Sequence, residues 1–179
     1  VGTVVGAYLG GPVSKALKGS KKAVIAAFIV MIAMLLISRV SYTQMMVVVV
    51  CMTIAQAGYG LIYAVIPAMY GDCVVYSEWK TGMRSDGSMY SMYTFSRKIG
   101  STIASSGLAF SLGLVGYVSG ENVVQTAEAV KGIYYVCNAI PTICYGLILV
   151  GIGLIFNLDK KKTDQMYAEM AAKREAAQK

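Results

Sequence analysis

The chain contains no histidine. This absence excludes histidine metal ligands, an imidazole base and a histidine-based pH switch. Charged residues are also scarce, at 14% of the sequence against about 25% in an ordinary soluble domain. The four cysteines form no C-x-x-C pair, so we interpret them as small buried residues and not as disulfides or metal ligands. Because the sequence also shows no nucleophile–base pair and no phosphate-binding loop, we expect a protein that is not an enzyme and has no cofactor.

Hydrophobic residues make up 56% of the chain. A helix needs roughly 20 mostly apolar residues to cross a bilayer. Four stretches meet this requirement, and a shorter apolar segment precedes them. The short segment is 1–12, and the four predicted spans are 23–40, 45–70, 87–117 and 133–156. We therefore predict an all-α integral membrane protein, with a transmembrane region over 1–156 and a helical tail over 157–179.

The first apolar segment opens directly at Val1, without the basic start and cleavage site of a signal peptide. We therefore expect the chain to be a fragment of a longer protein. Gly2, Gly6 and Gly10 recur every four residues in this segment, a spacing that lets two helices approach closely. Further along, Pro67 is a position at which the span 45–70 is expected to kink or end.

The net charge of +7 does not indicate nucleic-acid binding, because the cations lie between and after the apolar spans and form no basic groove. Loops 13–22 and 72–86 and the tail hold twelve lysines and arginines, against two in the intervening loops. Cytoplasmic loops carry an excess of these residues, so we predict a cytoplasmic tail. The tail helix either lies on the membrane surface, with Met166, Tyr167 and Met170 inward, or is solvated.

Lys98 lies within the predicted span 87–117, where the adjacent Arg97 is the only other charge. A cation at bilayer depth costs about 2.5–3.5 kcal/mol and usually faces a protein interior or a watery cavity. Of the six residues three, four or seven positions from Lys98, all but Phe95 carry a hydroxyl. The hydroxyl residues are Ser91, Thr94, Ser101, Thr102 and Ser105. The stripe predicts a solute or ion pathway; a structural ion pair with another helix is the alternative. Arg97 points about 100° away and is expected to be structural or to reach the interface.

Three segments resemble the glycoside–pentoside–hexuronide:cation symporters, the melibiose permease-like family of the major facilitator superfamily. Residues 72–84, Asp-Cys-Val-Val-Tyr-Ser-Glu-Trp-Lys-Thr-Gly-Met-Arg, resemble the family's loop between helices ten and eleven. Residues 90–101 resemble its helix eleven, with Lys98 followed by x-Gly-Ser, and residues 157–162 resemble the end of its helix twelve. Val75 and Ser77 depart from the aspartate and glycine usual in the family, which makes any charge network in the loop thinner.

The resemblance covers essentially the whole chain, from the end of helix eight to the carboxy terminus. It implies the carboxy-terminal portion of a twelve-helix transporter, with four full spans and one truncated span, in a bacterial inner membrane. It further implies transport of a sugar or glycoside, coupled to H+ or Na+ by alternating access. The coupling cation would be bound mainly by an amino-terminal half that this sequence does not include. The implied partners are the sugar, the lipid bilayer and that missing half, with no nucleic acid.

The resemblance also assigns roles to individual residues. Lys98 matches a lysine associated with the sugar site and with coupling, and Thr94 matches a hydroxyl neighbour. Together with Ser91 and Ser101 they are the predicted substrate-binding residues. A second set matches the cytoplasmic loop whose ion pairs tie the two halves together in the outward-facing state, and this set is Asp72, Glu78 and Arg84. The alternatives are that these charges are ordinary solvated residues, and that the protein is a non-transporting membrane scaffold or assembly protein.

Overall fold

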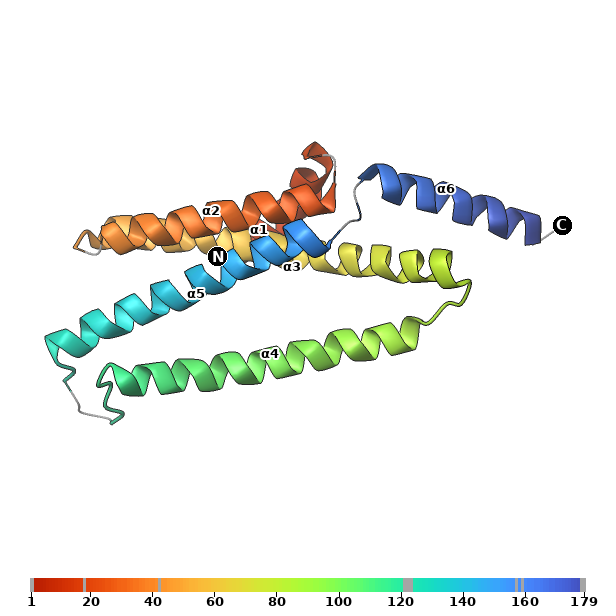
Figure 1. Cartoon of the computed structure of the whole chain (residues 1–179). Helices are drawn as coiled ribbons and strands as arrows, with labels where there is room; N and C mark the ends of the chain where they lie inside the picture. The colour runs from red at the N-terminus through yellow and green to blue at the C-terminus, as the bar shows by residue number, and fades with distance from the viewer. Residues whose placement is uncertain are drawn as a thin grey trace. The chain divides into compact units, whose positions relative to one another are not determined.

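A computed structural model describes residues 2–17, 19–41, 43–120, 124–156, 158 and 160–177. These residues are all-α: they form six helices and no strand (Figure 1). The helices are α1 (Gly2–Ala16), α2 (Ser20–Val40), α3 (Met45–Thr81), α4 (Asp86–Leu114), α5 (Ala127–Ile155) and α6 (Lys160–Ala177). The predicted all-α fold class is confirmed. Val1, Asn157 and Asp159, which belong to the predicted first segment and tail, lie outside the described residues.

The chain divides into two compact units, each with its own packing. The first contains Val1–Asp86 and Tyr145–Lys179, and the second contains Gly87–Cys144. In the first unit α1 and α2 both pack on α3. The buried residues of α2 recur at intervals of three and four, which places them on one face of the helix. Two of them, Phe28 and Met31, meet Ile62 and Val65 of α3 in the core.

The glycines of α1 allow a very close approach to α3, as their spacing predicts. A Cβ atom on Gly6 would lie 1.8 Å from the carbonyl oxygen of Ala57. In the opposite direction, a Cβ atom on Gly60 of α3 would lie 2.0 Å from the carbonyl oxygen of Thr3. Both glycines are buried. The two backbones are therefore in direct contact, which is how helices with small residues associate in membranes.

Helix α3 continues far beyond the predicted end of its span. Residues 72–81, predicted as part of a polar loop, are helical, and Pro67 lies inside the helix without ending it. The helix ends at Thr81 because Gly82 follows in a left-handed conformation, with φ of 71°, and donates its N–H to the Glu78 carbonyl at 2.8 Å. The loop prediction is therefore wrong for these ten residues. A polar composition was mistaken for a break, although no strong helix breaker stands between residues 72 and 81.

The second unit contains α4 and the first part of α5. The expected helix 87–117 stops earlier, at Leu114, because Gly116 takes a positive φ of 77°. Helix α5 begins earlier than the predicted residue 133. The Thr126 hydroxyl accepts a hydrogen bond from the Ala129 N–H at 3.2 Å and so caps the first turn. The predicted loop 118–132 is correspondingly shorter.

Three described helices, α2, α3 and α5, are long and apolar enough to cross a membrane. Helix α4 is long enough, with 29 residues, but it is not among the three. Its hydroxyl side chains, its glycines and the pair Arg97 and Lys98 make it more polar. The cysteine prediction is correct only in part: all four are free, and Cys51 is buried, but Cys137 and Cys144 are exposed.

Candidate functional site

The predicted substrate-binding residues lie along α4, in the second unit. Lys98, Ser91 and Ser101 are exposed and Thr94 is half-buried. The hydroxyls bond the backbone one turn earlier: Ser91 donates to the Gly87 carbonyl at 2.8 Å, and Thr94 donates to the carbonyl of Tyr90. These bonds satisfy the hydroxyl protons within the helix, as serine and threonine commonly do in membrane helices.

The remaining hydrogen-bonding capacity of this surface suits a polyhydroxylated ligand. A hydroxyl that donates one hydrogen bond keeps oxygen lone pairs that accept others. The Lys98 ammonium offers three donors and no acceptor. Thr94 and Lys98, one turn apart, therefore present an acceptor beside a donor. Adjacent hydroxyl groups of a sugar can donate to the first and accept from the second.

Arg97 has a different local partner. Its guanidinium carbon lies 5.7 Å from the ring centroid of Tyr93 on the same helix. A guanidinium at this distance from an aromatic ring is attracted by the ring's quadrupole. This contact fits the expectation that Arg97 has a structural role, separate from the stripe that contains Lys98.

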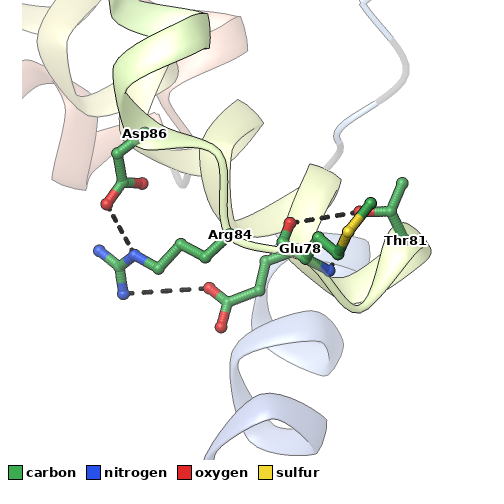
Figure 2. Close-up of polar contacts among 5 residues, drawn as sticks. Glu78, Thr81, Arg84 and Asp86 are labelled. Carbon is green, nitrogen blue, oxygen red and sulfur yellow. Dashed lines mark hydrogen bonds and ion pairs between the residues drawn. The ribbon is translucent and has the colours of Figure 1, made fainter.

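The second predicted set lies in the first unit, at the carboxyl end of α3. Figure 2 shows Arg84 extending between the carboxylates of Glu78 and Asp86. The Arg84 Nε atom lies 2.7 Å from Asp86 Oδ2, whereas its Nη1 atom lies 3.9 Å from Glu78 Oε2. The hydrogen bond to Asp86 and the attraction of that carboxylate raise the pKa of Arg84. Thr81 completes the turn by donating to the Ser77 carbonyl at 2.8 Å.

The contribution of this pair to stability is small. The Arg84 and Asp86 side chains are 55% and 52% exposed. Ion pairs between exposed side chains contribute little to stability, because water screens the attraction and both side chains lose freedom. The arrangement therefore orders the turn between α3 and α4 more than it stabilises the fold.

The tail helix α6 also contacts this end of α3. The Tyr167 hydroxyl donates to Asp72 Oδ1 at 3.0 Å, and the Trp79 indole N–H donates to Glu169 Oε2 at 2.7 Å. Partial burial, followed by the hydrogen bond to Asp72, raises the pKa of Tyr167. Hydrogen bonds from Gln165 and then Trp79 lower the pKa of Glu169.

Met166 and Met170 of the tail, predicted to face the membrane surface, are buried within the protein. Tyr167, predicted to face the same way, is 45% exposed. The packing of α6 on α3 was not expected from the sequence.

The structure thus brings Asp72, Glu78 and Arg84 to one end of α3 and places the Lys98 set on α4 in the other unit. Sequence reasoning missed Asp86 as the partner of Arg84, Tyr167 as the partner of Asp72, and the nearby Trp79–Glu169 pair. The Arg84–Asp86 pair had a visible signal, since opposite charges two residues apart flank the start of a helix. The pairing of Trp79 with Glu169 had none, because 90 residues separate them.

Comparison with known proteins gives consistent results. A model of the MFS/sugar transport protein family matches residues 1–160. The chain is 35% identical over 146 residues to a glucuronide carrier protein homolog of Escherichia coli, which is 80% of this chain and 31% of that protein. It is 31% identical over 152 residues to an uncharacterized symporter of Bacillus subtilis, 85% of this chain and 32% of that protein.

An isoprimeverose transporter of Lactiplantibacillus pentosus is 35% identical to this chain over 109 residues. The matched residues cover 60% of this chain and 22% of that protein. No solved structure matches the chain. The chain spans about a third of the length of the first two relatives. The resemblance to sugar symporters of the major facilitator superfamily is confirmed.

Proposed function

This chain belongs to the MFS/sugar transport protein family, and we propose from that premise that it forms the carboxy-terminal part of a sugar:cation symporter. It is a multi-pass membrane protein. The names of two relatives, a glucuronide carrier homolog and an isoprimeverose transporter, support a sugar or glycoside as the transported substrate. They also favour transport over the alternative of a membrane scaffold.

The observation that carries the proposal is the exposed Lys98 on α4, one helical turn from Thr94. A cation within a membrane-spanning segment is costly and by default indicates a substrate or ion pathway. We assign Lys98, Thr94, Ser91 and Ser101 to the sugar site, with the ammonium holding either sugar oxygens or an acidic group for which the sugar competes.

The transport cycle proposed is alternating access. Two halves rock about a site near the middle of the membrane. A cation, H+ or Na+, drives sugar uptake because both ligands favour the same conformational cycle. Asp72, Glu78 and Arg84 would act in this cycle at the cytoplasmic ends of the helices. The excess of lysine and arginine in the tail and in the loops on its side supports a cytoplasmic carboxy terminus in a bacterial inner membrane.

The test is uptake of radiolabelled glucuronide and isoprimeverose by cells that express the full-length protein, normalised to protein in the membrane. Lys98→Ala is expected to abolish or strongly impair gradient-driven uptake at near-normal expression. Thr94→Ala should weaken sugar binding by about 0.5–1.5 kcal/mol, the contribution of one hydrogen bond.

Arg97→Ala is the matched control, since it removes an adjacent positive charge that contacts Tyr93 instead of belonging to the stripe. It should impair uptake less than Lys98→Ala. Normal uptake by Lys98→Ala, or a greater loss in Arg97→Ala, contradicts the assignment of the site. If the unaltered protein takes up no sugar of either class, transport itself is contradicted and the scaffold function gains support.

A further inference from the structure

A cationic cleft of about 480 Å³ lies in the first unit, where α1 ends and α2 and α6 begin. Five lysines from these three helices line it: Lys15, Lys21, Lys22, Lys160 and Lys161. Two carboxylates, Asp72 and Asp164, also line it, and Asp72 accepts the hydrogen bond from Tyr167. The lining therefore carries an excess of positive charge, which favours an anionic ligand.

The two helix starts strengthen this preference. The first turn of a helix has unpaired N–H groups and a partial positive charge, so acidic residues are favourable there and cations are not. Neither α2 nor α6 has an acidic residue in its first turn. Lys21 and Lys22 occupy that turn in α2, and Lys160 and Lys161 occupy it in α6. Lys21 donates to the Phe156 carbonyl at 2.5 Å, and Asp72 and Asp164 offset part of the charge. The remaining excess of cations at the two positive helix ends favours a further anion between them.

An apolar groove of about 490 Å³ adjoins the lysine cleft, and the two share Phe156 and Leu158. The groove runs along the end of α5, past Gly151, Ile152 and Ile155. Both α2, which begins at the cleft, and α5, which ends there, are long and apolar enough to cross a membrane. The cleft therefore lies where membrane helices meet water, and the groove lies along the apolar part of one of them.

We propose that the lysine cleft and the apolar groove form one binding site for an anionic phospholipid of the surrounding membrane. The phosphate lies among the lysines at the two helix starts, and an acyl chain lies along α5. Basic pockets beside membrane helices bind anionic headgroups in this manner. Free phosphate would satisfy the lysines equally well, but it leaves the apolar groove unfilled. The inference depends on the membrane location of the chain and not on its transport function.

The first measurement is native mass spectrometry of the full-length protein in detergent, titrated with phosphatidylglycerol or with phosphatidylcholine of the same acyl chains. The test variant is Lys22→Gln/Lys161→Gln, because both side chains are exposed and line the cleft. Each lysine near an anionic headgroup contributes roughly a fivefold change in affinity, so the double variant should bind phosphatidylglycerol roughly 30-fold more weakly. Its binding of phosphatidylcholine should change little.

The control is Lys80→Gln/Lys173→Gln, which removes the same charge from exposed positions outside the cleft. It should bind phosphatidylglycerol as the unaltered protein does. Equal phosphatidylglycerol affinity in the test variant and the unaltered protein overturns the site. So does an equal loss in the test and control variants, which would show that net charge alone governs binding.

A second variant, Gly151→Leu, separates lipid from free phosphate. Gly151 lines the groove, and nothing lies within 4 Å of a Cβ atom added there. We therefore expect a leucine at this position to fill part of the groove. Phosphatidylglycerol binding should weaken, whereas competition by soluble glycerol phosphate should be unchanged. If glycerol phosphate or inorganic phosphate displaces the lipid at equal concentration, or if Gly151→Leu binds the lipid normally, the occupant is a free phosphate and the lipid assignment is wrong.

Discussion

Replacing Gly6 by alanine tests the backbone contact between α1 and α3. The added Cβ atom would lie 1.8 Å from the carbonyl oxygen of Ala57, and Cβ atoms essentially never come closer than 3.0 Å to another atom. The helices must therefore separate locally by about 1.2 Å, the difference between these two distances. Because the obstacle is backbone and not the end of a flexible side chain, no rotamer change relieves the clash.

The loss of stability in Gly6→Ala follows from the van der Waals contacts between α1 and α3 that this separation weakens. A gap of about 0.5–1 Å forfeits a quarter to a half of each dispersion contact, and the contacts of Gly60 with Thr3 and of Gly10 with Ala64 share the interface. Inserting a methyl group into a tight core typically costs about 1–3 kcal/mol. We expect Gly6→Ala to reach the upper end of this range, about 3 kcal/mol.

Gly11→Ala is the matched control, since it adds the same methyl group five residues away on the same helix, with nothing within 4 Å. It should leave the protein equally stable or stabilise it by about 0.5–1 kcal/mol, because glycine lowers helix stability. Denaturant titration of both variants in detergent micelles gives the difference in free energy of unfolding. If Gly6→Ala is as stable as Gly11→Ala, the helices are not in backbone contact and the packing is wrong.

Three further predictions concern the carboxyl end of α3, the tail helix α6 and the membrane topology. Arg84→Ala should leave the free energy of unfolding almost unchanged, because the ion pair is exposed to water, yet slow sugar uptake; normal uptake would contradict a role in the transport cycle. Since hydrogen bonds lower the pKa of Glu169, its carboxylate stabilises the contact with Trp79 above the ordinary glutamate pKa, and this contribution is lost as the pH falls through the lowered pKa. The emission of Trp79, obtained by subtracting the spectrum of the Trp79→Phe variant, should shift as the pH falls through the lowered pKa of Glu169. If the Glu169→Gln variant shows the same shift, the contact with Glu169 is not its cause. Single cysteines placed at Glu128 and Lys173 should react with an impermeant reagent in intact cells only at position 128, and the reverse pattern would contradict the proposed topology.

The sequence by itself determined the all-α class and the apolar spans that became α2, α3 and α5, although it placed residues 72–81 in a loop and counted the more polar α4 among the spans. These properties depend on each residue and its near neighbours along the chain. The spacing of Gly2, Gly6 and Gly10 indicated a close helix contact for the same reason, since one turn of helix sets which side chains share a face. The hydroxyl stripe around Lys98 was also visible in the sequence. The surface that faces this stripe was not, because the spacing of residues along a single helix does not indicate which other segment packs against it.

The tertiary structure decided everything that joins distant segments. It extended α3 eleven residues beyond the predicted span 45–70, gave Arg84 its closer partner in Asp86, and placed α6 against α3 through Tyr167 and Asp72, which are 95 residues apart. It also gathered lysines from α1, α2 and α6 around one cleft. Such contacts depend on which surfaces remain to be buried once the helices have formed. Many pairings of amphipathic faces satisfy the same local pattern, and only the packing of the whole chain selects among them.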